Sequence, residues 1–449
     1  MIDERNLENK RRQDMTDEER IRLFQRKLYR KAKQEKGFRF YMLYDKLTNL
    51  YLMREAWKRV KANRGAAGFD GMKLADVEKY GAEKYLSEIT EELRTKTYKS
   101  QPVLRVFIPK ANGKLRPLGI PTVKDRIVQM CCKLVIEPIF EADFEDCSYG
   151  FRPKRSAHNA ITVISDNLKK GKIQVYDADL SGYFDNIPHD KLMILVEQRI
   201  SDSRILKLIR MWLKAPVYED KQFKKNRKGT PQGGIISPLL ANIYLNLVDK
   251  AVNRKDGVFQ KYKIDIVRYA DDFILMGYRM PSECLNYLHA ILARMELTIN
   301  SDKTHLLNAR KEPFNFLGFT FRYVWSLHNK NKKYLRISPT KGSIINIRRK
   351  VGDYLRYNGR KNPYAVSKGL NSIMRGWLNY IIIPSVSYSN GGRFKLENYL
   401  WDRLRRYYKR KSQRASKLYR QGAFEVLTSR YGLIDPIIYK LVDSRECFR

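Results

Sequence analysis

The spacing of hydrophobic and polar positions along the chain predicts a mixture of helices and short strands. In four segments apolar residues recur every three or four positions, as they do on the buried face of a helix. These segments are 38–100 (with a Gly-rich break), 123–141, 190–214 and 283–297. Short strand-like runs predict strands at 103–108, 115–120 and 173–180, and the first two flank a turn and form a hairpin. Two more strands are expected within 264–278, so we expect an α+β fold.

Beyond about residue 330 the pattern changes to three successive helical stretches. Their apolar positions are Ile344, Ile347, Val351 and Leu355, then Val366, Leu370, Met374 and Leu378, then Leu396, Leu400 and Leu404. Residues 331–420 contain 23 Lys and Arg against 3 Asp and Glu, a local charge of +20. The pattern predicts a basic three-helix bundle, followed by a short tail at 411–449. At the other end, Thr16 has capping-box spacing and predicts a helix in a charged arm, which either is solvated or contacts RNA.

The amino-acid composition indicates which class of molecule the protein binds. The 449 residues include 89 Lys and Arg and 48 Asp and Glu, so the net charge is 89 − 48 = +41. Such an excess favours a polyanion as partner, either nucleic acid or an acidic membrane surface. No apolar run is long enough to span a membrane, and the N-terminus does not resemble a signal peptide. Five Cys without a CxxC pair suggest neither disulfides nor a zinc module, so we expect an intracellular nucleic-acid protein.

An acidic turn offers the first candidate chemistry. In the segment VRYADDFIL (267–275), Asp271 and Asp272 are flanked on both sides by apolar, strand-forming residues. Burying a carboxylate without a partner is costly, and two adjacent carboxylates repel each other. Cations relieve both effects, and Mg²⁺ prefers a few carboxylates together with water and phosphate oxygens. The turn therefore predicts a magnesium site rather than a solvated loop.

A second acidic strand end lies at Asp177-Ala-Asp179. Side chains alternate along a strand, so both acids face the same side. If this strand neighbours the 264–278 hairpin, the carboxylates converge as they do in two-metal sites for phosphoryl transfer. Asp185 is ambiguous between a metal ligand and a cap for a helix starting near Pro188, and we favour the cap. His189 has no His or Cys companion at ligand spacing and is expected to be structural.

Taken together, these motifs resemble the reverse transcriptases encoded by bacterial group II introns. The resemblance rests on ordered blocks that cover roughly residues 40–410. These are NRGAAGFDG (63–71), IPKANGKLRPLGIP (108–121), SYGFRP (148–153), DADLSGYFDNIPH (177–189), GTPQGGIISPLLANIYLN (229–246), YADD (269–272), LTINSDKTHLL (297–307), FLGF (316–319) and IMRGWLNYI (373–381). A YxDD tetrapeptide alone is a weak signal, whereas this many blocks in one order are specific.

The resemblance implies a right-hand polymerase with fingers, palm and an α-helical thumb, the fingers and palm sharing a central antiparallel sheet. The expected divisions are an arm at 1–37, N-terminal extension and fingers at 38–172, palm at 173–325, thumb or maturase domain at 330–410 and tail at 411–449. Many members carry a C-terminal DNA-binding region and a nuclease with Cys and His ligands. Only about 39 residues follow the thumb here, so we expect no nuclease domain.

The resemblance also implies roles for individual residues. Asp179, Asp271 and Asp272 are the expected catalytic ligands of two Mg²⁺ ions, which Mn²⁺ could replace. The expected nucleotide-binding residues are Lys110, Arg116, Leu180, Tyr183, Gln232 and Lys303, although Lys303 could instead be a solvated surface charge. Tyr183 takes the position of the bulky gate against a ribose 2′-hydroxyl, where the family often has Phe. Phe316, Leu317 and Gly318 fall where the end of the primer is held.

The basic helices independently predict an RNA-binding surface, because interleaved aromatic and cationic side chains stack on bases and grip phosphates. The expected RNA contacts are Arg403, Arg405, Arg406, Lys409 and Arg410, whereas Trp377 and Trp401 are expected to pack in a core. The expected partners are intron RNA, an RNA template with a DNA or RNA primer, dNTPs and a DNA target site, with no membrane. The oligomeric state stays open, a homodimer included.

Three functions fit this sequence. The first is an RNA-directed DNA polymerase of a group II intron that also acts as a maturase, in the bacterial cytoplasm and at the nucleoid during mobility. The second is an RNA-binding splicing cofactor with vestigial polymerase activity, although the intact Asp179, Asp271 and Asp272 argue against it. The third is a domesticated reverse transcriptase in defence or repair. The DNA that flanks the gene would separate these possibilities.

Overall fold

The computed structural model describes residues 15–109, 113, 115–326, 329, 331–359, 361–409 and 416–441. The chain divides into two compact units. The first comprises Met1–Arg155, Tyr176–Leu275 and Met280–His305, and the second comprises Ser156–Val175, Met276–Arg279 and Leu306–Arg449. Each unit is described below by itself.

Helices dominate the first unit. They are α2 (Asp17–Gln34), α3 (Tyr44–Leu47), α4 (Leu50–Ala62), α5 (Leu74–Tyr80), α6 (Ala82–Arg94), α7 (Val123–Glu141), α9 (Tyr183–Asn186), α10 (His189–Glu197), α11 (Ser203–Lys214), α12 (Ser237–Asn253), α13 (Val258–Lys261) and α14 (Ser282–Arg294). Helix α2 begins at the predicted capping box of Thr16 and Glu19 and packs against α4 and α7. Most of α7 is buried, because helices cover it on several sides.

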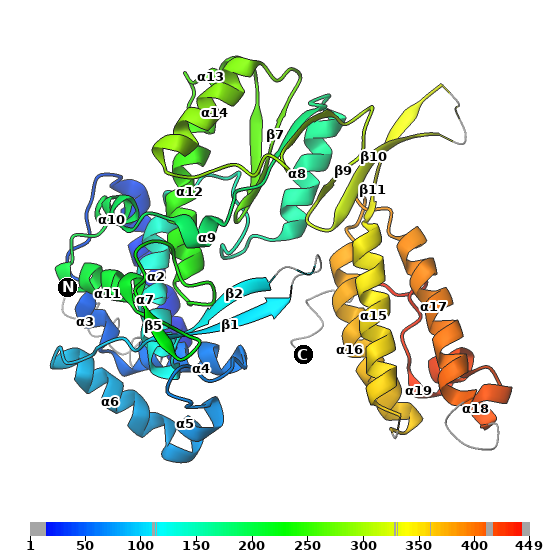
Figure 1. The fold of residues 1–449 in the computed structure, drawn as a ribbon, viewed down its shortest axis with the longest axis horizontal. Helices are drawn as coiled ribbons and strands as arrows, with labels where there is room; N and C mark the ends of the chain where they lie inside the picture. The colour runs from blue at the N-terminus through cyan, green and yellow to red at the C-terminus, as the bar shows by residue number, and fades with distance from the viewer. Residues whose placement is uncertain are drawn as a thin grey trace, which may run out of the picture. The chain divides into compact units, whose positions relative to one another are not determined.

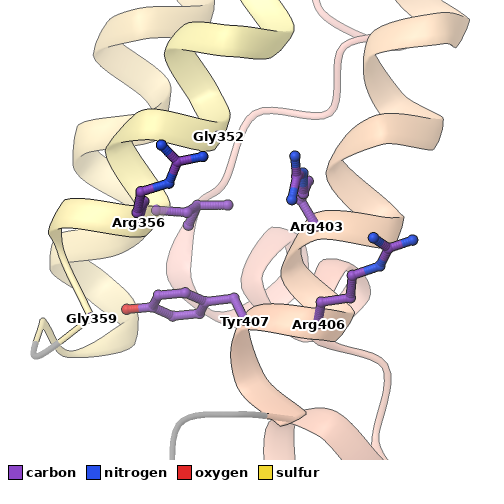
Figure 2. Close-up of a pocket in the computed structure, with 7 residues that line it drawn as sticks. Gly352, Arg356, Gly359, Arg403, Arg406 and Tyr407 are labelled. Atoms are coloured by element: carbon purple, nitrogen blue, oxygen red, sulfur yellow. The ribbon is translucent and has the colours of Figure 1, made fainter.

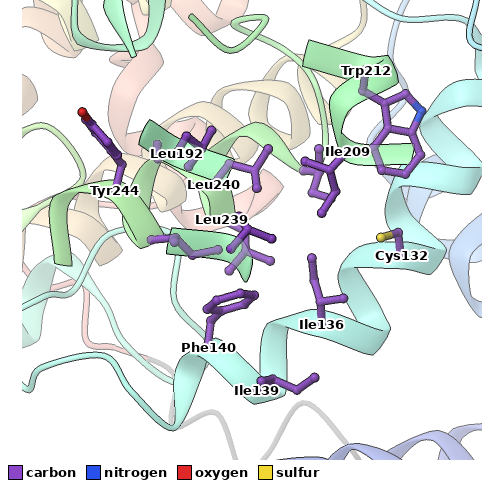
Figure 3. Close-up of a cluster of buried hydrophobic side chains, with 14 of the residues drawn as sticks. Cys132, Ile136, Ile139, Phe140, Leu192, Ile209, Trp212, Leu239, Leu240 and Tyr244 are labelled. Atoms are coloured by element: carbon purple, nitrogen blue, oxygen red, sulfur yellow. The ribbon is translucent and has the colours of Figure 1, made fainter. Parts of the chain in front are cut away.

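The core of the first unit joins α7 to α10, α11 and α12. Figure 3 shows Ile136, Leu192, Ile209 and Leu240, one from each of these helices, within this cluster. All four side chains are fully shielded from solvent or nearly so. Burial of such a large apolar surface is the main force that holds the acidic strands of this unit in place.

Two four-stranded sheets contain strands of the first unit. One has the order β2-β1-β4-β5 and is formed by β1 (Val103–Pro109), β2 (Leu115–Ile120), β4 (Val217–Glu219) and β5 (Gln222–Lys224). Its β1–β2 pair is the predicted antiparallel hairpin, with Ile108 opposite Arg116. The other has the order β6-β7-β3-β8 and is formed by β3 (Gln174–Ala178), β6 (Asp265–Tyr269), β7 (Asp272–Gly277) and β8 (His305–Asn308). The boundaries of the first unit run through β3, β7 and β8.

The second unit combines a small sheet with a helical bundle. Its elements are α8 (Ala157–Lys169), β9 (Phe314–Phe316), β10 (Phe319–Trp325), β11 (Lys333–Pro339), α15 (Lys341–Tyr357), α16 (Pro363–Ile381), α17 (Asn390–Lys409), α18 (Lys417–Arg420) and α19 (Ala423–Tyr431). Strand β10 pairs antiparallel with β9 and β11. Helices α16 and α17 each run beside α15 (Figure 1), and their predicted apolar positions form one core.

The structure confirms several local expectations and corrects others. The 190–214 pattern is not one helix but two, α10 and α11, because Asp202 caps a new helix by accepting bonds from the amides of Arg204 and Ile205. The predicted tail contains α19, which buries Phe424 and Leu427 against the bundle. Trp401 is 41 % exposed and stacks on Phe424 at its edge, so it is not a core residue.

Candidate active site

The acidic turn joins two buried strands of the first unit. Strand β6 ends at Tyr269 and β7 begins at Asp272, so Ala270 and Asp271 form the connection. Ala270 has a φ of 59°, in the left-handed region that a residue with a Cβ rarely adopts. Val267 on β6 and Phe273 on β7 are fully buried, so both flanking strands are anchored in the core. The turn therefore presents its two carboxylates from a firmly anchored hairpin, as the pattern predicts.

A buried arginine, Arg268, donates a hydrogen bond to the backbone of this turn. Arg268 is completely shielded from solvent, and its Nε donates to Asp249 Oδ1 at 2.8 Å. Its Nη1 donates at 2.9 Å both to the carbonyl of Ala270 and to Asn242 Oδ1. Asn242 in turn donates to the carbonyl of Gly150 at 2.8 Å. The network links the YADD turn to the SYGFRP segment and to helix α12.

The second acidic strand end lies close enough to the turn to interact with it electrostatically. Asp179 follows β3 directly, and its Oδ2 accepts hydrogen bonds from Lys303 Nζ at 2.9 Å and Asn300 Nδ2 at 3.2 Å. Thr304 Oγ1 accepts from the Asp179 amide at 3.3 Å. The LTINSDKTHLL segment therefore positions Asp179, and its lysine partly neutralises it.

Burial and mutual repulsion raise the pKa values of this group of acids. Burial, followed by repulsion from Asp271, Asp179 and Asp177, raises the pKa of Asp272 to about 6. Burial and then Asp179 likewise raise the pKa of Asp177 to about 6, although His305 opposes the shift. The pKa of Asp271 is raised mainly by burial, against the charge of Arg116.

These carboxylates have the chemistry of a magnesium site but are not yet gathered into a coordination shell. Within the described ranges, no group of three or more His, Cys, Asp and Glu side chains is placed to hold a metal ion. The ammonium of Lys303 pairs with one of these carboxylates, 2.9 Å from Asp179 Oδ2. Hard oxygen donors that repel one another fit Mg²⁺, because a divalent cation would relieve the repulsion.

A polar chain approaches the site from the β1–β2 hairpin. Arg116 on β2 donates from Nε to Gln232 Oε1 at 2.9 Å, and Gln232 Nε2 donates to Asp185 Oδ2 at 2.8 Å. Asp185 is therefore not a helix cap, which corrects that expectation: α10 begins at His189 with Pro188 at its N-cap. His189 is buried, with Nε2 2.7 Å from the carbonyl of Gly229, as expected of a structural histidine. Lys110 lies outside the described residues.

The expected gate residue lies beneath the surface. Tyr183 is only 2 % exposed, and its hydroxyl donates to the carbonyl of Ala241 at 2.6 Å. Burial raises the pKa of this phenol well above its ordinary value. Leu180 is also buried and forms an isolated β-bridge with Ile299. Both residues lie near the acids in sequence, and their contact with a nucleotide stays a prediction.

The FLGF segment forms a tight turn in the second unit. Leu317 and Gly318 both have positive φ, 47° and 76°, and they connect β9 to β10. Tyr380 Oη donates to the carbonyl of Leu317 at 2.8 Å, and the amide of Thr340 donates to that of Gly318 at 2.9 Å. Phe316 is buried beneath this turn, so the exposed part is the backbone around Gly318.

The predicted RNA contacts lie on α17 of the second unit. Arg405, Arg406 and Lys409 are exposed, and Arg403 is half-buried. Arg406 Nε lies 3.0 Å from Asp402, one turn earlier. Arg410 lies outside the described residues. The surface is therefore cationic, as the charge count predicts.

Sequence reasoning missed the residues that support the acidic turn. Arg268, Asp249 and Asn242 form the network beneath the turn. The available signal was one charge of each sign among apolar neighbours, Arg268 within 266–270 and Asp249 at the end of 243–249. Such charges are rarely buried unless they pair with each other.

No helix within the described ranges is long and apolar enough to cross a membrane.

Comparisons with known proteins identify the family of the chain. The family model described as reverse transcriptase (RNA-dependent DNA polymerase) matches residues 108–321. Protein YkfC of Escherichia coli (strain K12) is 36 % identical over 333 residues, which cover 66 % of this chain and 86 % of that protein. Group II intron-encoded protein LtrA of Lactococcus lactis subsp. cremoris is 41 % identical over 214 residues, 47 % of this chain and 35 % of LtrA. Nuclear intron maturase 1, mitochondrial, of Arabidopsis thaliana is 33 % identical over 118 residues, 26 % of this chain and 16 % of that protein. The chain thus spans most of YkfC, about a third of LtrA and about a sixth of the Arabidopsis maturase.

Proposed function

The chain belongs to the reverse transcriptase family of group II intron-encoded proteins, and from this premise we propose that it is an RNA-directed DNA polymerase that also acts as a maturase. The observation that carries the proposal is the anchored turn of Asp271 and Asp272 within electrostatic range of Asp179. We assign the β1–β2 hairpin to the fingers, the β6-β7-β3-β8 sheet to the palm and the α15–α17 bundle to the thumb.

The proposed reaction is attack of a primer 3′-hydroxyl on the α-phosphate of a dNTP, with release of pyrophosphate. Asp179, Asp271 and Asp272 would hold two Mg²⁺ ions, with Mn²⁺ as a substitute. When bound, the metal supplies positive charge that activates the attacking oxygen and stabilises the leaving oxygen. Arg116 and Lys303 carry the charge that suits the triphosphate, and Gln232 fixes Arg116 through its 2.9 Å bond.

Three further assignments concern the substrate. Tyr183 would exclude a 2′-hydroxyl by the bulk of its buried ring, whose hydroxyl is already engaged by Ala241. The turn of Leu317 and Gly318 would hold the primer end through its exposed backbone. The α17 cations Arg403, Arg405, Arg406 and Lys409 would contact RNA phosphates. Lys110 remains a candidate by motif alone, and Arg410 by its place in the basic cluster. The proposed partners are an RNA template with primer, dNTPs, intron RNA and a DNA target.

Primer extension on an RNA template with dNTPs and Mg²⁺ tests the polymerase. We compare the wild type with Asp271→Asn, which keeps the size of the side chain but removes its charge. We expect extension by the wild type only, with RNA binding retained by both. Loss of RNA binding together with extension would mean that Asp271 maintains the fold. If neither protein extends a primer while both bind RNA tightly, the chain is a splicing cofactor that has kept its acids for structure.

The maturase role is tested by RNA binding. The net charge of +41 predicts contacts with many phosphates. Affinity should fall steeply with added salt, because the counterions that the protein displaces from the RNA gain less entropy when they enter a more concentrated solution. For about six to ten contacts the loss is about 10³- to 10⁵-fold between 50 and 200 mM salt. The matched comparison is a group II intron RNA against an unrelated RNA of equal length. Equal affinity and a flat salt response would count against the maturase role.

A further inference from the structure

A pocket of about 420 Å³ opens in the second unit between α15 and α17. Figure 2 shows Arg356 on the α15 side and Arg403, Arg406 and Tyr407 on the α17 side. Leu355 also lines the pocket and is 6 % exposed. No acid is among the described residues that line it. The pocket therefore combines three guanidinium groups with an apolar surface and one aromatic ring.

The position of Arg403 is fixed by a neighbouring tyrosine. Arg403 Nε donates to Tyr399 Oη at 2.9 Å, and its guanidinium carbon lies 5.2 Å from the centre of the Tyr399 ring. Tyr399 reaches this position because Gly352 stands opposite: a Cβ on Gly352 would lie 2.7 Å from Tyr399 Oη. A guanidinium that is already oriented loses less freedom when it binds an anion.

The aromatic side of the pocket is held as well. Tyr407 Oη donates to the carbonyl of Asn358 at 2.9 Å, just beyond the end of α15. The edge of its ring meets Tyr408, with centroids 4.9 Å apart and planes at 87°. Tyr407 lies across the end of the pocket opposite Arg356 and Arg403 in Figure 2. The ring is half-buried, so part of it remains available to a ligand.

The remaining two arginines keep donors for an anion. Arg406 uses Nε toward Asp402 at 3.0 Å, and Arg356 Nη1 lies 3.8 Å from Asp353. Both pairs are exposed ion pairs and are therefore weak. Each guanidinium carries five N–H donors, so these contacts leave others for a phosphate.

We propose that this pocket binds one unpaired nucleotide of an RNA strand. Its phosphate would contact Arg356, Arg403 and Arg406, and its base would lie against Tyr407 and Leu355. The volume lies within the ordinary range of small-ligand sites, about 300 to 1,000 Å³. Bases that leave a stack are commonly bound by aromatic rings and guanidinium planes. The choice of RNA as ligand rests on the proposed function.

An unpaired nucleotide fits the arginines and the apolar lining of this pocket better than double-stranded RNA does. Arginines alone would suffice to grip the phosphates of a duplex, whose bases remain stacked on one another. The fixed ring of Tyr407 and the buried Leu355 that line the pocket add an apolar contact that only a base turned out of the stack can use. Stacking of one base on an aromatic side chain contributes about 1 to 3 kcal/mol.

The test compares two probes, a short single-stranded RNA and an RNA duplex of the same length. We expect Tyr407→Leu to weaken binding of the single strand at least about fivefold and to leave the duplex unchanged. Tyr407→Phe keeps the ring and should bind both probes like the wild type. Arg356→Gln should weaken the single strand and lower its salt slope by about 0.7, the value for one phosphate.

The matched comparison is Arg405→Gln, which removes the same charge from α17 at a position outside the pocket. It should weaken both probes to the same extent. If Tyr407→Leu affects both probes equally, or neither, the pocket does not bind a base. Thermal unfolding of each variant checks its fold.

A second measurement uses the wild-type protein alone. Single-stranded RNA that carries 4-thiouridine is cross-linked by light, and the modified peptides are mapped. Adducts on Tyr407 or its pocket neighbours support the proposal, and adducts confined to other regions reject it. Primer extension by the same preparation tests polymerase activity separately from base binding in the pocket. Extension without any effect of Tyr407→Leu rejects only the pocket, and a clear effect of Tyr407→Leu without extension rejects only the polymerase.

Discussion

Arg268 and Asp249 form an ion pair that solvent does not reach: both side chains are 0 % exposed. The same guanidinium also donates to the carbonyl of Ala270 at 2.9 Å. The pair therefore connects helix α12 to the backbone of the turn that carries Asp271. Buried ion pairs often add little net stability, because both charges lose their hydration. A contact to a strained turn instead suggests that this pair positions the acids.

Replacing Arg268 by Met should destabilise the fold by about 3 to 5 kcal/mol, because it leaves Asp249 charged and buried without a partner. Chemical denaturation measures this loss. The double variant Arg268→Met with Asp249→Leu removes both charges and should regain most of the stability. We expect the double variant to remain defective in primer extension, since the carbonyl of Ala270 still lacks its donor. Full extension by the double variant would show that the pair serves stability alone.

Gly150 lies directly against the backbone of the acidic turn. A Cβ at this position would lie 2.3 Å from the amide nitrogen of Ala270 and 2.9 Å from the carbonyl carbon of Tyr269. Gly150→Ala should therefore shift the turn and reduce the rate of extension about 100-fold, because small errors in the position of reacting groups are costly. RNA binding should be unchanged. Gly37→Ala is the control, since nothing lies within 4 Å of the added Cβ. Normal extension by Gly150→Ala would mean that the turn tolerates displacement.

The strands and turn around Asp271 could be predicted because their signal is local. An acidic pair between two apolar runs indicates a hairpin whatever the rest of the chain does. The supporting Arg268 and Asp249 could not be paired in this way, since 18 residues separate them and each run also fits a solvated charge. Only the packing of α12 against β6 brings them together.

Other differences have equally specific causes. The apolar period runs through 190–214 without a Gly or Pro, so the break that Asp202 introduces is marked only by the N-cap residues Ser201-Asp-Ser203. Asp202 also accepts from the amides of Leu43 and Tyr44, both at 2.8 Å, and these contacts are distant in sequence. Helix α19 is short, and its amphipathic pattern is too brief to distinguish from a tail. The expectation that Asp185 caps a helix rested on spacing alone. Its partner Gln232 lies 47 residues away in the sequence, so local spacing could not reveal the contact.

Lys303 should compete with metal for Asp179. Its ammonium lies 2.9 Å from Oδ2 and is 60 % exposed, so the pair contributes at most about 1 kcal/mol. We expect Lys303→Ala to bind Mg²⁺ up to about fivefold more tightly in the absence of nucleotide, by isothermal titration calorimetry. The same variant should extend primers more slowly, because the triphosphate loses a cation. Lys191→Ala is the control: Lys191 pairs with Glu296 at 2.8 Å, away from the acids. Weaker Mg²⁺ binding by Lys303→Ala would contradict competition.

Tyr183 should select deoxyribonucleotides by the size of its ring rather than by its hydroxyl. The hydroxyl is already bound to the carbonyl of Ala241, and the ring is held edge-on by Phe184, with centroids 5.5 Å apart. Tyr183→Phe should therefore keep the preference for dNTPs over ribonucleotides and lose about 1 kcal/mol of stability with the hydrogen bond. Tyr183→Val opens space beneath the sugar and should raise the relative kcat/KM for ribonucleotides about tenfold or more, equivalent to about 1.4 kcal/mol of discrimination. Single-nucleotide extension with matched dNTP and ribonucleotide pairs measures the ratio. An unchanged ratio in Tyr183→Val would remove Tyr183 from the nucleotide site and leave it as a core residue beneath the acids.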